Sequence, residues 1–336
     1  MNNNILKEFK NKSILITGGT GSIGIGLIKE LNQYQPKTIR ILTNDENSLF
    51  ELKEKFGERK NMTYIIGDVR DKQRLDVALR NIDIVFHAAA MKHVDICEQN
   101  PFDAVKTNVY GTSNIIEASL VENISKFILI STDKATNPTT TLGASKLLAE
   151  RLTINAVSYN GQGKTKFGIV RFGNVIGSRG SVFQIFFRRI QNNLPLNVTD
   201  ENMTRFIMSI SEAASMILDV TTKIDRGEVF VLKMPSVKIK DLAEVMIEVY
   251  QKKFNSKNAP PIKISKVRER EKLFEMLVTK EEISHCRDLG KMYKISPEKN
   301  ASPPKIEDFS SETSKYISRI ELKKLVSELF DEYLNY

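Results

Sequence analysis

Cysteine is scarce in this 336-residue chain, which contains only Cys97 and Cys286. Two thiols cannot build a disulfide framework, so a reducing cytoplasm is the expected location. Histidine is also rare, and His87, His93 and His285 show no ligand spacing with the cysteines. We therefore expect no metal site and assign the histidines structural roles.

Long hydrophobic runs are missing as well. No apolar stretch approaches the roughly 18 to 20 residues of a membrane helix, and the first residues, MNNNILKEFKNK, lack the apolar region of a signal peptide. No membrane partner is expected. The hydrophobic fraction of 41% is nevertheless enough for a sizeable globular core.

The charge is basic, at +9, but no basic block or aromatic-basic ladder accompanies it. Scattered lysines of this kind do not favour nucleic acid as a partner. An anionic small molecule, together with a solvated lysine surface, accounts better for the charge.

The first half of the chain alternates between strand and helix patterns. We expect strands at 13–17, 38–42, 62–66, 82–87, 127–130 and 167–172, and helices at 48–56, through Leu75 and Leu79, at about 101–121 and at about 143–159. This alternation predicts an α/β fold with a Rossmann-type doubly wound parallel sheet, whose ligand lies at the carboxyl ends of the strands.

The pattern loosens after Gly173. We expect helices at 182–192, after the Ser209–Glu212 capping pair, through 242–249 and after the Ser318–Glu321 pair, an extended segment at 194–206, a strand at 228–232, and a strand followed by a helix within 262–277. Residues 295–315 have the composition of an ordered loop or a tail. The predicted domains are a dinucleotide-binding Rossmann domain (1–175, with 207–233 returning to it) and a smaller α/β substrate-binding domain (176–206 and 234–336).

A glycine-rich turn follows the first strand. Gly18, Gly21 and Gly24 have the spacing of a dinucleotide-binding turn, with a strand before it and a helix after it. The glycines permit a tight turn, close approach to a pyrophosphate and close packing of helix on strand. Ala88, Ala89 and Ala90 end the fourth strand, where small residues let a flat cofactor lie near the backbone.

The stretch FILISTDKATNPTTTLGASK, residues 127–146, places charged groups at the end of a buried strand. Asp133 and Lys134 stand where an acid and a base would act on a ligand at the sheet edge. The competing interpretation is an ordinary surface turn.

Together these motifs resemble a known family. TGGTGSIG, GDVRD, FHAAAMKHV, KTNVYGT, STDKATNP, GASK, RFGNVIGSRGS, MTRF and REREKL occur in order over nearly the whole chain. The sequence resembles the extended short-chain dehydrogenase/reductases, and within them the polysaccharide-biosynthesis branch of nucleotide-sugar 4,6-dehydratases that act on UDP-N-acetylglucosamine.

The resemblance implies a role for each member of Thr132-Asp133-Lys134. In the family, hydride leaves carbon 4 of the sugar, a base removes the proton on carbon 5, an acid protonates the departing hydroxyl on carbon 6, and hydride returns to carbon 6. Lys134 is the expected base, which requires a lowered pKa, and Asp133 is the expected acid. Thr132 is expected to bridge the 4-hydroxyl to Lys134, unless Lys134 performs both deprotonations or Thr140 or Thr141 helps.

One residue departs from the family pattern. Lys146 matches the lysine of YxxxK, which holds the nicotinamide ribose, but Leu142 stands in place of the tyrosine. A leucine cannot take the proton of the 4-hydroxyl, so another group must do so.

The resemblance also implies the ligand contacts. The expected substrate-binding residues are Lys92, Asn174, Arg179, Arg205, Arg268 and Glu271. The expected cofactor-binding residues are Gly18, Thr20, Gly21, Ser22, Ile23, Gly24, Thr43, Asn44, Asp45, Asp68, Val69, Ala88, Ala89, Ala90, Asn108 and Lys146.

The resemblance implies NADP as the cofactor. NAD is the alternative, because Thr43-Asn44-Asp45-Glu46 lacks the arginine that relatives carry there and Asp45 could accept the ribose hydroxyls of NAD. The expected partner is a small-molecule nucleotide sugar. The resemblance also implies a homo-oligomer, because the helices at 101–121 and 143–159 lie where relatives pair into a four-helix dimer interface. Alternatives are a nucleotide-sugar epimerase, a GDP-sugar 4,6-dehydratase, or a catalytically silent cofactor-binding protein.

Overall fold

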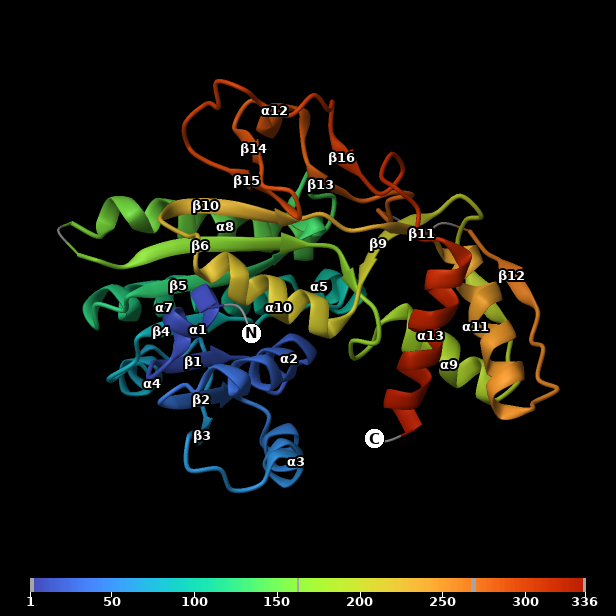
Figure 1. Cartoon of the computed structure of the whole chain (residues 1–336), viewed down its shortest axis with the longest axis horizontal. Helices are drawn as coiled ribbons and strands as arrows, with labels where there is room; N and C mark the ends of the chain where they lie inside the picture. The colour runs from blue at the N-terminus through green and yellow to red at the C-terminus, as the bar shows by residue number, and fades with distance from the viewer. Residues whose placement is uncertain (1–2, 162, 267–269, 335–336) are drawn as a thin grey trace.

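A large sheet forms the centre of the computed structural model, which describes residues 3–161, 163–266 and 270–334. Within these residues nine strands pair in the order β14-β15-β10-β6-β5-β4-β1-β2-β3 (Figure 1). Their bounds are β1 (Ser13–Thr17), β2 (Thr38–Thr43), β3 (Met62–Ile66), β4 (Ile84–His87), β5 (Lys126–Thr132), β6 (Lys166–Phe172), β10 (Arg226–Leu232), β14 (Cys286–Asp288) and β15 (Met292–Ile295).

The strands from β3 to β10 run parallel, and β15 pairs antiparallel with β10. The order 3-2-1-4-5-6 is that of a doubly wound dinucleotide-binding sheet, so the predicted fold class is confirmed. All five residues of β1 are buried, as expected for a strand covered on both faces.

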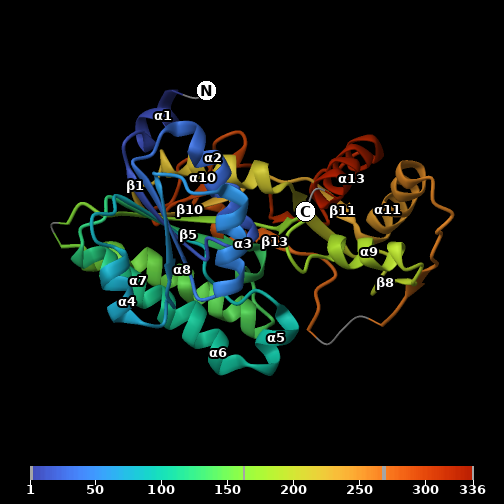
Figure 2. The same ribbon diagram turned by 90° about the horizontal axis from the view of Figure 1, so that it is seen from below.

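Helices cover both faces of this sheet. In Figure 2, α1, α2 and α10 lie on one side and α4, α7 and α8 on the other, and α10 packs against α2 while α7 packs against α4 and α8. The bounds are α1 (Asn3–Phe9), α2 (Ser22–Leu31), α3 (Glu46–Phe56), α4 (Lys72–Ala78), α5 (Val94–Gln99), α6 (Pro101–Val105), α7 (Gly111–Val121), α8 (Thr141–Tyr159) and α10 (Ile210–Thr221). The expected helix at 101–121 is continuous, but it passes through a π-helical turn at Lys106–Tyr110.

A smaller lobe lies beside the sheet, on the right in Figure 1. It contains α9 (Val182–Gln191), β8 (Leu196–Val198), α11 (Ile239–Phe254), β12 (Ile262–Ile264) and α13 (Arg319–Leu334). Its core is a hydrophobic cluster separate from that of the sheet, in which the rings of Phe187 and Phe330 lie 5.0 Å apart. A three-stranded sheet of β7 (Asn174–Val175), β9 (Thr204–Met208) and β11 (Ser236–Lys238) lies between the two parts.

The segment after residue 264 differs from the expectation. No helix forms in the described part of 265–277; instead β13 (Met276–Val278) pairs with β16 (Phe309–Ser310), with α12 (Lys280–Ile283) between them. The predicted helix was wrong because contacts distant in sequence override local periodicity: Ser311 N donates to Glu275 O at 2.8 Å. The same pairing orders the 295–315 segment.

The predicted domain boundary also needs correction. β14 and β15 belong to the large sheet, and residues from Leu277 to Ile295 contribute to its core. Part of the 234–336 segment therefore packs with the dinucleotide-binding sheet. None of the helices in the described ranges is long and apolar enough to cross a membrane.

Candidate functional site

The glycine-rich turn lies at the carboxyl end of β1. Gly18 has φ +63°, and a Cβ there would lie 2.8 Å from the backbone of Ala89. A Cβ on Gly24 would lie 2.5 Å from the backbone of Gly19, so only glycine allows α2 to begin this close to the turn. Gly21 caps α2 without a side-chain hydrogen bond, which leaves the positive helix end available to an anion.

The ends of β2 and β3 lie next to this turn. The hydroxyls of Thr20 and Thr43 are 3.0 Å apart, and Asn44 Nδ2 donates to Asp68 Oδ2 at 3.2 Å. The sequence reasoning expected each of these four residues at the cofactor, and the structure brings them together. With the open helix end, this edge of the sheet fits a dinucleotide.

Asp45 is committed to capping α3. Its carboxylate accepts hydrogen bonds from Ser48 N at 3.0 Å and Ser48 Oγ at 2.5 Å. These bonds lower the pKa of Asp45, and Arg179 contributes to the same direction. Among the other expected cofactor residues, Val69 is buried, and Ile23, Ala88 and Ala89 pack against the core of the sheet.

The side chain of Arg179 does not line the cavity that holds other expected substrate residues. Its Nη2 donates to Thr20 O at 2.6 Å, its Nη1 to Ser48 Oγ at 3.1 Å, and its backbone N to Ser22 Oγ at 3.0 Å. This is a correction, because the guanidinium adjoins the glycine-rich turn rather than the cavity described below.

Asn108 also needs correction. It is only 1% exposed. Its Oδ1 accepts a hydrogen bond from Met91 N, and its Nδ2 donates to Met91 O and to Ser145 Oγ. It therefore supports the loop after β4 and does not face a ligand.

Lys146 is buried on α8, where its Nζ donates to Ile130 O at 2.7 Å. Burial lowers its pKa to about 8, although Glu150 opposes the change. His87, nearby, bonds to Thr17 and Thr112, and burial lowers its pKa to about 3, so its predicted structural role is confirmed.

The acid–base pair lies where β5 ends. Asp133 begins a 3₁₀ turn and is fully buried; its Oδ1 accepts from Thr132 Oγ1 at 2.8 Å and from Lys134 Nζ at 3.0 Å. Its Oδ2 has no hydrogen-bond partner among the residues that the structure describes. The glycine of the GASK motif lets α8 pack close to this turn, because a Cβ on Gly143 would lie 2.4 Å from Lys134 O.

Lys134 differs from the expectation in its electrostatics. Its Nζ lies 3.3 Å from Glu275 Oε1 in addition to the contact with Asp133. Burial by itself lowers the pKa of Lys134, but the carboxylates of Asp133 and Glu275 outweigh burial, against the opposing charge of Arg205. The pKa of Lys134 is therefore raised, whereas the expected base role requires a lowered value.

Sequence reasoning missed Glu275. The residue is 4% exposed, and its Oε1 lies 3.9 Å from Arg205 Nε as well as close to Lys134. Glu275 is an acidic residue just after the REREKL motif, but the helix expected there gave no indication that its side chain faces the site.

Leu142 is buried and does not line the cavity described below. It is 3% exposed and forms a small apolar cluster with Cys97 and Ala104, against which Met91 and Val94 pack. The residue thus completes a hydrophobic contact between α5, α6 and α8.

A cavity of about 530 Å³ opens beside Lys134, between the sheet and the smaller lobe. This volume is within the usual range of ligand pockets. Four expected substrate residues line it: Lys92, Asn174, Arg205 and Glu271. Arg268 lies outside the described residues. Sequence reasoning missed further lining residues, among them Arg189, Arg270, Lys272 and Glu275.

Charge in the cavity is mainly basic. Lys92 donates to Arg179 O at 2.6 Å, and burial together with the charge of Arg179 lowers the pKa of Lys92. Lys272 donates to Thr136 O and Asn137 O at 3.0 and 2.6 Å. These cations and Arg205 can hold an anionic ligand.

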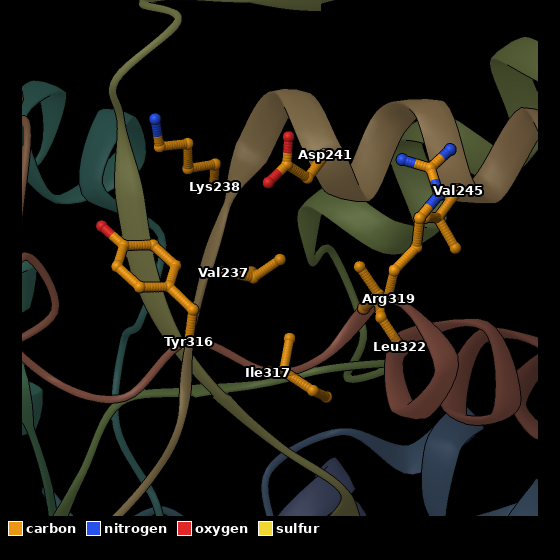
Figure 3. A pocket seen from close by; sticks show the side chains of 8 residues that line it. All are labelled: Val237, Lys238, Asp241, Val245, Tyr316, Ile317, Arg319 and Leu322. Carbon is orange, nitrogen blue, oxygen red and sulfur yellow. The ribbon is translucent and has the colours of Figure 1, made fainter.

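A second pocket, of about 280 Å³, lies between α11 and α13 (Figure 3). Val237, Ile317 and Leu322 form its apolar part, and Arg319 and Asp241 its charged rim. None of the expected catalytic, cofactor-binding or substrate-binding residues that the structure describes lines this pocket, and we assign it no function. Among the described residues, no group of three His, Cys, Asp or Glu side chains is arranged to hold a metal ion.

Comparison with known proteins agrees with the motifs. The relatives include an archaeal protein named "Uncharacterized membrane protein MJ1061" from Methanocaldococcus jannaschii, 48% identical over 96% of this chain and 97% of its own length. A Campylobacter jejuni UDP-N-acetylglucosamine 4,6-dehydratase (inverting) is 41% identical over 86% of this chain and 84% of its own. A Rickettsia bellii UDP-glucose 4-epimerase is 36% identical over 96% and 97%.

Among solved structures, Pen from Bacillus thuringiensis superposes with a TM-score of 0.89 at 40% identity, covering 95% of this chain and 98% of that one. The family model described as polysaccharide biosynthesis protein matches residues 14–297. With the glycine-rich turn, the acid–base pair and the cavity all within or beside that range, the chain belongs to this polysaccharide biosynthesis family of short-chain dehydrogenase/reductase enzymes.

Proposed function

We propose that the protein is a nucleotide-sugar 4,6-dehydratase that converts UDP-N-acetylglucosamine to a 4-keto-6-deoxy sugar nucleotide for glycan biosynthesis, with inversion at carbon 5. The observation that carries the proposal is the contact of 3.0 Å between Lys134 Nζ and Asp133 Oδ1 beside the cavity. An epimerase needs no such pair, because it removes no hydroxyl group. The inverting Campylobacter relative supports the substrate and the stereochemistry.

The chemistry follows from the positions of three side chains. Lys134, as the neutral amine, removes the proton on carbon 5, and Asp133, as the carboxylic acid, protonates the hydroxyl that leaves carbon 6 as water. A nicotinamide dinucleotide, when bound, supplies hydride acceptance at carbon 4 and hydride return at carbon 6. Thr132 Oγ1 donates to Asp133 Oδ1, so the proton of the 4-hydroxyl can pass through Thr132 to Asp133. This route takes over the role of the tyrosine that the family pattern has at the position of Leu142.

We propose NADP as the cofactor, with NAD as the alternative. Arg179 supports this choice, because its guanidinium contacts Thr20 in the glycine-rich turn and Ser48 in the first turn of α3, the helix that follows β2. The adenosine ribose of a Rossmann cofactor lies near the end of β2. Asp45, which would favour NAD, is occupied in capping α3. Fluorescence titration with each dinucleotide tests the choice, since Arg179→Met should weaken NADP binding and leave NAD binding unchanged.

A homo-oligomer is also part of the proposal. Large apolar side chains are exposed on the helices of one face of the sheet, among them Phe102, Tyr110, Val121, Leu148 and Tyr159. These helices, α6 to α8, lie together in Figure 2. An exposed apolar surface of this kind favours association with a second copy, and light scattering measures the mass.

Product mass tests the function. Incubated with UDP-N-acetylglucosamine and NADP, the protein should release one water from the sugar nucleotide, and Lys134→Ala should abolish this loss while still binding the dinucleotide. Lys92→Ala, which alters another cavity lysine, is the matched control and should raise KM more than it lowers kcat. An unchanged product mass with altered stereochemistry would support the epimerase named by the Rickettsia relative, and near-normal dehydration by Lys134→Ala would exclude our base.

A further inference from the structure

Glu275 has the features of a group that takes part in the reaction. Its carboxylate is buried, one oxygen lies 3.3 Å from Lys134 Nζ, and it lines the cavity. The other oxygen, Oε2, has no hydrogen-bond partner within the described part of the chain. Its backbone is held from both sides by Ser311, through Glu275 N to Ser311 Oγ at 3.0 Å and Ser311 N to Glu275 O at 2.8 Å. A buried carboxylate with an unused oxygen calls for a functional explanation.

The pair of Asp133 and Lys134 cannot accommodate all the protons that move during the proposed reaction. Lys134 Nζ and Asp133 Oδ1 form an ion pair at 3.0 Å, in which the transferable proton is on the nitrogen. Oxidation at carbon 4 releases a second proton, from the 4-hydroxyl, which the hydrogen bond from Thr132 directs to Asp133. Elimination then needs Asp133 protonated and Lys134 neutral. The original proton of Lys134 therefore requires a third site.

We propose that Glu275 takes this proton from Lys134 and holds it during elimination, so that it is a positioning residue acting through Lys134. The inference rests on the proposed dehydratase function. An N–H bond of Lys134 breaks as an O–H bond forms on Glu275. The amine then accepts the carbon 5 proton while the C6–O bond breaks and Asp133 protonates the leaving oxygen. Inversion requires carbon 5 to be reprotonated from the face opposite Lys134, so a water molecule supplies this proton and Lys134 gives its own proton to the resulting hydroxide. Glu275 then returns the held proton to Lys134.

The surrounding charges are consistent with this role. Arg205 faces the cluster from β9, and Lys272 lies in the same segment as Glu275. Glu271 lies 3.9 Å from Arg205 and Asp133 contacts Lys134 from the end of β5. Two carboxylates thus flank Lys134 at rest, which agrees with the raised pKa, and transfer of one proton to Glu275 removes one of those charges.

Lysine labelling tests the proposal without depending on turnover. The full-length protein is treated with acetic anhydride between pH 7 and 10, and acetylation of Lys134 is followed by peptide mass spectrometry. In Glu275→Gln the neutral amine should be at least tenfold more abundant at fixed pH, because one carboxylate no longer stabilises the ammonium; a tenfold change corresponds to about one pKa unit. Glu275→Asp should give a smaller rise. Lys92 is the internal control, since the charge of Glu275 does not contribute to its pKa shift.

Turnover supplies the second readout. In Glu275→Gln, kcat for water loss should fall at least 100-fold with KM within threefold, and reduced cofactor should accumulate because oxidation proceeds and elimination stalls. Glu275→Asp should recover part of kcat. Unchanged Lys134 labelling in both variants, or a Glu275→Gln kcat within threefold of the parent enzyme, would overturn the inference. If Glu275→Gln does not fold, as judged by circular dichroism, unchanged labelling in Glu275→Asp alone overturns it. A parent enzyme that releases no water contradicts the proposed function instead, while the labelling result still tests the Lys134–Glu275 coupling.

Discussion

Replacing Leu142 with tyrosine tests whether the site works without the family hydroxyl. Leu142 is buried among Cys97, Ala104, Met91 and Val94 and does not line the cavity. A tyrosine ring on this rotamer overfills the cluster, at about 1 to 3 kcal/mol, and burying an unpaired hydroxyl adds about 1 to 3 kcal/mol. We expect the variant to be destabilised by about 2 to 6 kcal/mol and to gain no activity.

Two measurements check this prediction. Thermal unfolding should show a lower Tm, by roughly 2 to 4 °C for each kcal/mol lost in a chain of this size. Turnover of UDP-N-acetylglucosamine should stay within about threefold of the parent enzyme per folded molecule. Leu142→Met is the matched control, because it conserves volume and should cost less than about 1.5 kcal/mol. A tenfold or larger gain in kcat for the tyrosine variant would refute the reasoning, since the hydroxyl would then have to reach the substrate and not the cluster.

Two further predictions concern charged groups. Because the pKa of Lys146 is lowered to about 8, its ammonium is lost as pH rises through that value, so dinucleotide affinity measured by fluorescence should weaken above pH 8 in the parent and stay constant in Lys146→Arg. Arg171→Met should lower the free energy of unfolding by about 3 to 5 kcal/mol in urea, because it leaves Glu150, 2.7 Å away and buried, without its partner. The exposed Arg226→Met is the control and should cost less than about 1 kcal/mol; equal losses would contradict the argument.

Local pattern was sufficient for the Rossmann half of the fold. Parallel strands buried on both faces appear as continuous apolar runs, so β1, β5 and β6 were recognisable to within two residues. The start of α10 was recognisable for a similar reason, since Ser209 and Glu212, only three residues apart, form a capping box there. Both signals involve neighbouring residues only.

The segment after residue 264 could not be read in this way. Its charged and apolar residues have helical spacing, yet β13 pairs with β16 and Glu275 bonds with Ser311, more than thirty residues away. Arg179 illustrates the same problem for the site, because its contacts with Thr20 and Ser22 connect residues about 157 to 159 apart in sequence. Periodicity contains no information about such partners.

The sequence by itself determined which groups stand at the end of β5: a buried apolar run must stop there, and Asp133 and Lys134 follow it. Only the tertiary structure decided the charge state of Lys134. Electrostatic interaction depends on distance and burial, and Glu275 reaches within 3.3 Å of Lys134 from a distant segment of the chain. Tertiary structure also decided the surroundings of Leu142, because its neighbours Cys97 and Ala104 come from other helices.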